Sequence, residues 1–288
     1  MDFTEFSKYF YRELKFAFLN ALSDYYDASE ANAVFHYWIL EKNQWSLKDW
    51  INHLDEPIKN PEQLWSDFQK LLNKMPVQYV VNRAYFMGLP FYVNSFVLIP
   101  RPETESLVRE IQKKITLDFD GTILDIGTGS GCIALALKKK YLHSNIYGID
   151  VSKEALEVAQ KNAESLNVSV NWICRSIFDF QNIDFQNIEI IISNPPYIPL
   201  EEKNELKEHV KNFEPHTALF SGSDSLSFYQ QITHLAKHWL KKQGILAYEI
   251  HSKYALEIKE LMEENGFQDI EVIKDDFQRE RVILGFLS

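Results

Sequence analysis

The stretch TILDIGTGSGCIALALKKK, residues 122–140, decides the fold of this chain. It begins with TILDI (122–126), which reads as a buried strand, and passes through three closely spaced glycines into the helical pattern GCIALALKKK. Gly127, Gly129 and Gly131 let the backbone turn tightly and approach a ligand closely, because no Cβ stands in the way. A strand that turns through such a loop into a helix is typical of nucleotide-binding α/β sheets.

A regular alternation of strand and helix signals surrounds this stretch. RPETESLVREIQKK (101–114) predicts a helix before it. The segments expected after it are the strand NIYGID (145–150), the helix SKEALEVAQKNAESL (152–166), the strands VNWIC (170–174) and IEIIIS (188–193), a helix near 226–241, the strand ILAYEI (245–250), a helix near 253–265, and the closing strands DIEVIK (269–274) and RVILGF (281–286). This alternation predicts an α/β fold, in which a mostly parallel sheet is covered by helices on both faces.

The first seventy-odd residues carry a different pattern, which predicts a small all-helical bundle. The apolar residues that recur at helical spacing and would line one helix face are Phe3, Phe6, Phe10, Leu14, Phe18 and Leu22. Asp27 with Glu30 forms a capping-box pattern ahead of Val34 and Phe35, and Ser46 repeats the signal. We find no catalytic constellation in this part of the sequence.

Residues 76–96 separate the two patterns. Aromatic and β-branched residues alternate there around the Gly-Leu-Pro sequence at 88–90, which predicts a β-hairpin. We therefore expect three parts: a helical bundle over 1–75, a hairpin linker over 76–96, and a catalytic domain over 97–288.

The composition is that of a globular, acidic protein. The chain has 288 residues, of which 45% are hydrophobic and 14% aromatic, and its formal net charge is −11. Bulk nucleic-acid binding relies on Lys and Arg residues that neutralise phosphates, so this charge argues against it. Cys132 and Cys174 have no spacing typical of a zinc site or a disulfide framework. The acidic, amphipathic start and the lack of a long apolar stretch predict a cytoplasmic protein with no signal peptide and no membrane association.

Asp150 ends the strand that follows the glycine loop. A carboxylate at that position can accept hydrogen bonds from both hydroxyls of a ribose. The glycines are spaced Gly-x-Gly-x-Gly, whereas a pyrophosphate over a helix N-terminus favours Gly-x-Gly-x-x-Gly. S-adenosylmethionine, which has a ribose but no phosphate, fits this spacing better, and a dinucleotide remains the open alternative at this point.

The motif SNPPYIP (193–199) follows the isoleucine-rich strand and decides between these ligands. Pro195 and Pro196 fix φ and remove two backbone donors, so that carbonyl oxygens dominate the local polar groups. Asn194 adds a side-chain carbonyl oxygen, and Tyr197 adds a flat surface. Two converging acceptors would bind both hydrogens of an NH₂ group and direct its nitrogen lone pair at an electrophile, such as the methyl group of S-adenosylmethionine. The sequence thus predicts N-methylation, with Asn194, Pro195 and Tyr197 as catalytic residues.

Two rival functions share parts of this pattern. Asn-Pro-Pro-Tyr chemistry also serves enzymes that methylate exocyclic amines of adenine or cytosine in nucleic acids, although the acidic charge weighs against that substrate. A non-catalytic, nucleotide-sensing protein would leave the motif idle. His234 and His238 are spaced as metal ligands can be, but no third ligand suggests itself, so we expect no metal site.

Over essentially its whole length the chain resembles the peptide chain release factor N5-glutamine methyltransferases, the HemK family. The motifs that carry the resemblance are QYV (78–80), VLIPRPETE (97–105), DIGTGSGCIAL (125–135), GID (148–150), SNPPYIP (193–199), EPHTALFSGSD (214–224) and FQRERVILG (277–285). PRPETE ahead of the glycine loop, together with NPPY, is highly specific. The sequence departs from the family pattern at Asn82, where Gly is usual, at Ser176, where Asp is common, at Ser225 and in EIHSKY (249–254).

The resemblance implies a class I methyltransferase sheet whose last strand is antiparallel, and a helical amino-terminal domain that docks the release factor. It implies methylation of the glutamine in the Gly-Gly-Gln motif of class 1 peptide chain release factors, with S-adenosylhomocysteine as the product and no metal. The residues implied to hold the cofactor are Gly127, Thr128, Gly129, Ser130, Gly131, Asp150, Ile177 and Asn194. Those implied to hold the glutamine are Asn194, Pro195, Pro196 and Tyr197. We expect a monomer that does not bind nucleic acid directly.

Overall fold

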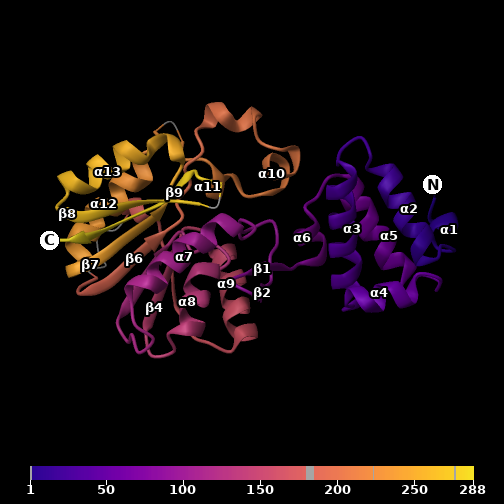
Figure 1. The fold of residues 1–288 in the computed structure, drawn as a ribbon, viewed down its shortest axis with the longest axis horizontal. Helices are drawn as coiled ribbons and strands as arrows, with labels where there is room; N and C mark the ends of the chain where they lie inside the picture. Colours follow the sequence, from indigo (N-terminus) through magenta and orange to yellow (C-terminus); the bar gives the residue numbers. More distant parts are fainter. Residues whose placement is uncertain (1, 180–184, 223, 276) are drawn as a thin grey trace. The chain divides into compact units, whose positions relative to one another are not determined.

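Two compact units make up the computed structural model (Figure 1). The described residues are 2–179, 185–222, 224–275 and 277–288. The first unit consists of Met1–Arg83 together with Lys207–Phe213, and the second of Ala84–Leu206 together with Glu214–Ser288. A short segment from far along the sequence thus belongs to the amino-terminal unit.

Helices form the first unit. They are α1 (Phe3–Phe6), α2 (Tyr11–Ala21), α3 (Ala28–Asn43), α4 (Leu47–His53), α5 (Pro61–Leu72), α6 (Val77–Val81) and α10 (Glu208–Phe213). Asp27 caps α3 by accepting hydrogen bonds from the backbone N–H groups of Ser29 and Glu30, and Ser46 caps α4 in a capping box with Asp49. The core between these helices is rich in aromatic rings, which follows from the aromatic faces in the sequence.

The apolar run near the amino terminus does not form the single helix face that its spacing predicted. Helix α1 ends at Phe6, and Phe10 takes an extended conformation before α2 begins. The backbone bonds to another segment at this point, because the Tyr11 N–H donates to the Glu56 carbonyl at 3.1 Å. Phe3 and Phe10 are consequently 39% and 42% exposed. A pairing between distant segments here overrides local periodicity.

Helix α10 and the residue before it contact the rest of the amino-terminal unit through polar side chains. The hydroxyl of Tyr25 lies 3.0 Å from Nδ1 of His209, and Lys207 forms an ion pair with Glu30 at 3.3 Å. The structure therefore groups residues 207–213 with the helices, whereas the sequence pattern placed them within 97–288. These partners are far apart along the chain, so local sequence signals do not reveal them.

A mixed β-sheet, seven-stranded within the described residues, is the centre of the second unit. Its strands are β3 (Thr122–Ile126), β4 (Asn145–Asp150), β5 (Asn171–Cys174), β6 (Ile188–Ser193), β7 (Leu240–Glu249), β8 (Phe267–Lys274) and β9 (Glu280–Leu287). The strand order is β5-β4-β3-β6-β7-β9-β8, in which the first five strands are parallel and β9 is antiparallel to both its neighbours. The prediction of a class I methyltransferase sheet with an antiparallel last strand is confirmed.

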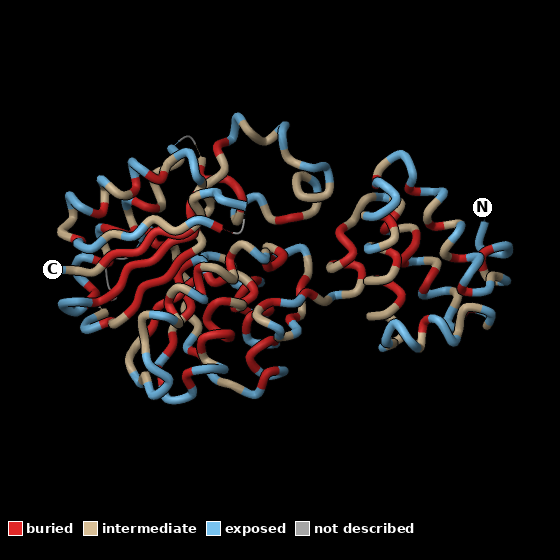
Figure 2. Tube along the Cα trace, viewed as in Figure 1, coloured by how far each residue is buried: buried red, intermediate tan, exposed pale blue. Residues whose placement is uncertain are grey.

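Helices cover both faces of this sheet, as predicted. One apolar cluster packs α7 (Pro102–Lys114), α8 (Cys132–Lys140) and α9 (Lys153–Leu166) on one face, and another packs α12 (Ser227–Trp239) and α13 (Ala255–Glu264) on the other. Figure 2 shows central strands buried along much of their length. The shorter elements are α11 (His216–Leu219), η1 (Ile177–Asp179), η2 (Leu200–Asn204) and η3 (Ser252–Tyr254). None of the described helices combines the length and the apolar character needed to cross a bilayer.

A short hairpin opens the second unit. It pairs β1 (Ala84–Phe86) with β2 (Leu89–Phe91) in antiparallel register, so it is shorter than the hairpin predicted over 76–96. The preceding residues form α6 instead, because Val77 and Val80 turn into the core of the helical unit. Asn82 ends α6 with φ of +54°, a left-handed conformation that Gly adopts freely and Asn tolerates. This explains how Asn can stand where the family pattern has Gly.

Candidate active site

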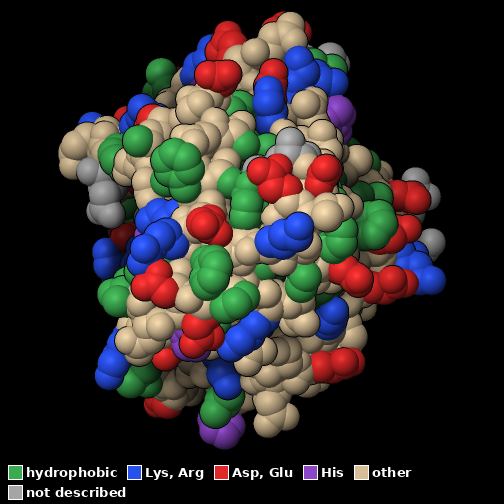
Figure 3. Space-filling view, turned by 90° about the vertical axis from the view of Figure 1, so that its right-hand side faces the viewer, with side chains coloured by type: hydrophobic (Ala, Val, Ile, Leu, Met, Phe, Trp, Pro, Cys, Tyr) green, Lys and Arg blue, Asp and Glu red, His purple; other side chains and the backbone are tan. Residues whose placement is uncertain are grey.

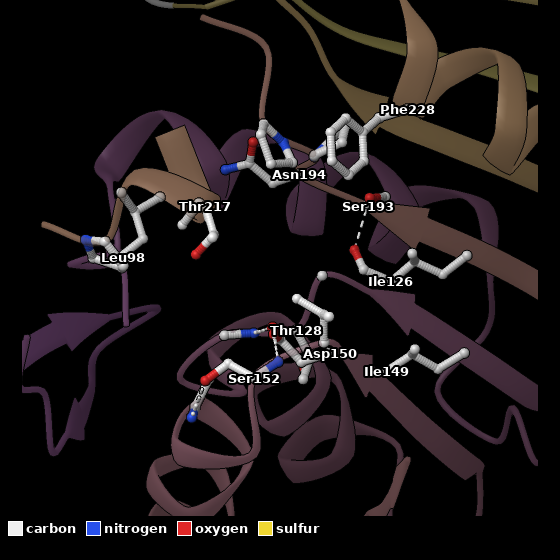
Figure 4. Close-up of a pocket in the computed structure, with 18 of the residues that line it drawn as sticks. Leu98, Ile126, Thr128, Ile149, Asp150, Ser152, Ser193, Asn194, Thr217 and Phe228 are labelled. Atoms are coloured by element: carbon white, nitrogen blue, oxygen red, sulfur yellow. Dashed lines mark hydrogen bonds between the residues drawn. The ribbon is translucent and has the colours of Figure 1, made fainter. Parts of the chain in front are cut away.

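A cavity of about 400 Å³ opens at the carboxyl ends of β3, β4 and β6 (Figure 4). The chain runs from β3 outward to β4 and β5, and then crosses back to β6 on the other side of β3. Strand order therefore reverses between β3 and β6, which is where ligands bind in open parallel sheets. The volume lies in the range of roughly 300–1,000 Å³ that is usual for small-molecule sites.

The glycine loop between β3 and α8 forms one wall. Gly127, Gly129 and Gly131 have φ of +73°, +54° and +78°. Glycine adopts these left-handed conformations with little strain, whereas residues with a Cβ do not. A Cβ at Gly129 would point into open space, so its absence leaves room for a ligand against the backbone. A Cβ at Gly131 would instead lie 3.0 Å from Cη2 of Trp172 and 3.1 Å from Cδ1 of Leu135, so a side chain here would crowd β5 and α8.

Asp150 lies at the cavity at the end of β4. Its Oδ2 accepts a hydrogen bond from the Gly129 N–H at 2.8 Å, and its Oδ1 accepts one from the Ser152 N–H at 2.9 Å. These bonds hold the carboxylate against the loop, and each oxygen retains capacity for a second donor, such as a ribose hydroxyl. Burial raises the pKa of Asp150, while the two backbone hydrogen bonds favour its ionised form.

An apolar surface lines another part of the cavity. It includes Ile177 of η1, the adjacent Phe178, and Phe228 of α12. The two phenyl rings meet edge to face with centroids 5.2 Å apart, and Gln231 donates to the Ile177 carbonyl at 2.9 Å, which holds η1 against α12. A planar base such as adenine fits a surface of this kind.

The loop after β6 forms the wall across from Asp150 (Figure 4). Ser193 donates to the carbonyl at the end of β3 at 2.7 Å, which ties the start of the loop to the neighbouring strand. Asn194, Pro195 and Pro196 then line the cavity. The acceptor-rich motif predicted from the sequence therefore lies at the same cavity as the carboxylate.

Tyr197, the next residue along the loop, is not part of the described lining of the cavity. Its hydroxyl donates to Oε1 of Glu249 at 3.1 Å. Its ring packs edge to face against the ring of His251, with the ring centroids 5.9 Å apart. Burial raises the pKa of the Tyr197 hydroxyl, and the nearby carboxylate raises it further. Its expected role as a flat surface for the substrate stays a prediction.

Thr104 and Glu249 connect to the loop from two other elements. The side-chain Nδ2 of Asn194 donates to Oγ1 of Thr104 at 3.1 Å, and this hydroxyl donates to Oε2 of Glu249 at 2.6 Å. Both residues are almost fully buried, at 3% and 2% exposure. Burial raises the pKa of Glu249, against the hydrogen bonds from Thr104 and Tyr197 and the charge of Arg281.

Sequence reasoning assigned no role to either residue, although a signal for Glu249 was present. Glu249 is an acidic residue at the carboxyl end of β7, and the same rule of position identified Asp150 on β4. Sequence reasoning also assigned no role to Leu98 and Thr217, which lie on one side of the cavity in Figure 4. Leu98 lies in the segment before α7 and Thr217 lies in α11, and neither side chain carries a charge that would single it out in the sequence.

An ion pair links two of the loops that border the cavity. Arg101 pairs with the buried carboxylate of Glu214, whose Oε2 also accepts the Ile99 N–H at 3.3 Å. Burial raises the pKa of Glu214, while the adjacent guanidinium favours the ionised form. The pair joins the segment before α7 to the segment before α11.

Asp125, at the base of the glycine loop, is expected to make stability depend on pH. Burial raises its pKa to about 7, and its Oδ1 has no hydrogen-bond partner among the described residues. The folded protein therefore keeps a proton that the unfolded chain releases near pH 4. The contribution of the protonated Asp125 side chain to the free energy of unfolding is fully present below pH 4 and is lost as pH rises through 7.

The variant Asp125→Asn tests this, because its amide oxygen can accept the bonds that Oδ2 receives from Thr128 and Ala134. We expect the variant to lose less stability than the unsubstituted protein between pH 5 and pH 8. Urea unfolding at several pH values measures the difference. Identical pH dependence in both proteins would show that Asp125 is already ionised at low pH.

Most of the residues predicted from the sequence meet at this cavity. Those that line it are Gly127, Thr128, Gly129, Ser130, Asp150, Ile177, Asn194, Pro195 and Pro196. Gly131 and Tyr197 lie outside its described lining. His234 and His238 sit on α12 with ring centroids 5.2 Å apart, and the described part of the chain places no group of three or more potential ligands around a metal.

Known proteins share both the sequence and the fold. Residues 102–212 match the model of the methyltransferase small domain family. A release factor glutamine methyltransferase of Flavobacterium psychrophilum is 39% identical over 92% of this chain and 95% of its own length. The chain belongs to the release factor glutamine methyltransferase family. Another member of the family, from Enterococcus faecalis, is 36% identical over 86% of this chain and 89% of its own length.

A solved structure shows the same fold at lower identity. A methyltransferase from Pyrococcus furiosus superposes with a TM-score of 0.51 at 18% identity, over 78% of this chain and 96% of its own. The resemblance seen in the sequence motifs is thus confirmed by relatives that span nearly the whole chain.

Proposed function

We propose that this chain methylates the side-chain amide nitrogen of the glutamine in the Gly-Gly-Gln motif of class 1 peptide chain release factors, with S-adenosylmethionine as the methyl donor. The observation that carries the proposal is the cavity that has Asp150 on one wall and Asn194 on the opposite wall. Family membership supports the choice of substrate, because the relatives are named for it.

The residues present fit S-adenosylmethionine. Asp150 can accept from a ribose, the bare backbone at Gly129 leaves room beside it, and the surface of Ile177 and Phe228 fits a planar base. The bound donor supplies an electrophilic methyl group on a positively charged sulfur, and S-adenosylhomocysteine remains after transfer. No metal takes part in the proposal.

The acceptor loop holds the other reactant. The side-chain oxygen of Asn194 and the carbonyl of Pro195 would accept hydrogen bonds from the two hydrogens of the amide NH₂ group, since neither proline has an N–H that could compete. An amide nitrogen is a weak nucleophile because its lone pair is delocalised. Drawing both protons toward fixed acceptors favours a more tetrahedral nitrogen and aims the lone pair along the transfer direction.

Proton transfer follows methyl transfer in this scheme. The nitrogen that gains the methyl group becomes cationic and acidic, and it releases one proton to solvent. A strong base is therefore not required before transfer. The contribution of the loop is orientation and electrostatic stabilisation of the developing charge.

Mass spectrometry of a purified release factor tests the proposal. We expect one methyl group on the glutamine of the Gly-Gly-Gln motif after incubation with the enzyme and S-adenosylmethionine. Parallel reactions contain a short Gly-Gly-Gln peptide, a single-stranded oligonucleotide, or no acceptor. Methylation of the oligonucleotide in place of the release factor would favour exocyclic amines as the substrate. Binding of the methyl donor without transfer to any acceptor would favour a sensing function.

The helical unit is proposed to dock the release factor, and the chain is proposed to act as a cytoplasmic monomer without direct nucleic-acid binding. A glutamine side chain alone is too small to distinguish one protein from another, so selectivity must draw on contacts far from the reacting nitrogen. The net charge of −11 supports a protein partner over a polyphosphate. On the face shown in Figure 3, hydrophobic side chains are interspersed with charged side chains of both signs.

Exposed apolar side chains on the helical unit are expected to contribute to this docking. Phe16 of α2 and Ile51 of α4 are 69% and 65% exposed. The double variant Phe16→Ser with Ile51→Ser should lower kcat/KM for an intact release factor roughly tenfold, because it removes apolar contact area from the complex. Activity on the short peptide should not change.

Point substitutions are preferable to deletion of the first 75 residues, because α10 belongs to the same unit and would lose its packing partners. Leu256→Ser in the second unit is the matched control, since Leu256 is also 65% exposed. Steady-state kinetics with both substrates compare the three proteins. A double variant as active as the control on the intact factor would remove these two side chains from the docking surface.

A further inference from the structure

The side-chain amide of Asn194 must present its oxygen to the acceptor for the proposed reaction to work. An amide has two nearly isosteric ends, one an acceptor and the other a donor. If the NH₂ end of Asn194 faced the NH₂ group of the substrate glutamine, two hydrogen-bond donors would face each other. The hydrogen bond that holds the substrate nitrogen would then be lost. The groups around Asn194 must therefore favour one of the two amide orientations over the other.

The hydrogen bonds of Thr104 make this choice. Both carboxylate oxygens of Glu249 accept, one from the Tyr197 hydroxyl at 3.1 Å and the other from the Thr104 hydroxyl at 2.6 Å, so the single hydroxyl hydrogen of Thr104 points to Glu249. The hydroxyl oxygen then offers only lone pairs to Asn194. It is consequently the Nδ2 end of the amide that bonds to Thr104, at 3.1 Å, and the Oδ1 end is directed elsewhere.

Glu249 is itself held in place from several sides. Tyr197 donates to its second carboxylate oxygen at 3.1 Å, and Tyr229 donates to its backbone carbonyl at 3.0 Å. The hydrogen bonds from Asn194 to Thr104 and from Thr104 to Glu249 form a relay. Thr104 and Glu249 are buried, so water does not compete with this relay. The hydrogen bond from Thr104 to Glu249 thus determines the direction of the next bond, in which Asn194 donates to Thr104.

We propose that Thr104 and Glu249 are positioning residues that orient the Asn194 amide with its carbonyl oxygen toward the methyl acceptor. The inference rests on the proposed function, in which that oxygen binds the glutamine NH₂ group. A flipped amide would require the Thr104 hydroxyl to donate to Asn194 and abandon Glu249, which would leave a buried carboxylate oxygen without its donor. The relay therefore opposes the non-productive orientation.

Thr104→Val removes the hydroxyl at nearly constant shape and is the main test. We expect kcat to fall about tenfold while KM for the release factor changes less than about twofold, because remote contacts still bind the substrate when the amide is flipped. Thr104→Ser, which restores the hydroxyl, should return kcat to near the unsubstituted value. Glu249→Gln should lower kcat in the same way, since its amide can donate to Thr104 and permit the flip.

A double-substitution cycle distinguishes orientation from general support of the fold. Thr104→Val should cost nothing further in an Asn194→Ala background, because no amide is left to orient. An equal loss in both backgrounds, or no loss in either, would overturn the proposal. Thermal unfolding of each variant identifies any that fail to fold.

A readout independent of activity separates this proposal from the proposed function. The side-chain NH₂ resonances of Asn194 can be assigned in a ¹⁵N-labelled protein by their loss in Asn194→Ala. We expect them to shift in Thr104→Val and to remain near their original position in Thr104→Ser. Unchanged resonances in Thr104→Val would contradict the hydrogen bond, whether or not release factors prove to be the substrate. A shift without methylation of any release factor would retain the relay and reject the substrate.

Discussion

Replacing Asn194 with alanine is expected to lower turnover on the release factor by about a hundredfold or more, the size of effect seen when one preorganised polar contact is removed from a transition state. Asn194 is partly exposed at the cavity and makes its one side-chain hydrogen bond within the described residues to Thr104. Its loss should therefore leave the fold intact. The measurement is single-turnover methyl transfer at saturating donor and release factor.

The matched control is Asn145→Ala. Asn145 is exposed at the amino end of β4, at the edge of the sheet opposite to the cavity, so this variant should turn over normally. Circular dichroism confirms that both variants are folded. A folded Asn194→Ala enzyme with near-normal turnover would contradict the proposal that Asn194 binds the substrate nitrogen. It would also contradict the proposed role of Thr104 in orienting Asn194.

Replacing Asp150 with alanine is expected to weaken binding of S-adenosylmethionine by about 1.5–3 kcal/mol for each hydrogen bond lost from a ribose hydroxyl, which is roughly ten- to a hundredfold in affinity per bond. The substitution also frees the backbone N–H groups of Gly129 and Ser152, which the carboxylate now holds. Isothermal titration calorimetry measures the affinity. Asp120→Ala, at an exposed position outside the cavity lining, is the control.

A ligand analogue separates the two effects of that substitution. S-adenosylhomocysteine that lacks the ribose 2′-hydroxyl should bind the unsubstituted protein more weakly than the complete ligand does. The difference should vanish in Asp150→Ala, because the hydroxyl then has no carboxylate to meet. If the analogue is penalised equally in both proteins, Asp150 holds the loop but does not bind the ribose.

The sequence by itself determined the layered α/β architecture and the two polar residues on opposite walls of the cavity, Asp150 and Asn194. Strands β3, β4 and β6 match the predicted segments TILDI, NIYGID and IEIIIS residue for residue. A buried parallel strand needs a continuous apolar run, and a tight strand-to-helix turn needs glycine, so both leave local signals. Asp150 and Asn194 were found because chemistry at the carboxyl end of a strand is set by position along the chain.

Only the tertiary structure decided which groups act on one another across elements. Phe10 became a break between helices because its neighbours bond to a distant segment, and α10 joined the amino-terminal helices through His209 and Lys207. The relay from Glu249 through Thr104 joins β7, α7 and the loop after β6. Burial makes these polar groups seek partners wherever the fold provides them, and that need has no periodicity along the sequence. The orientation of the Asn194 amide is therefore a property of three segments brought together, and no one of them alone specifies it.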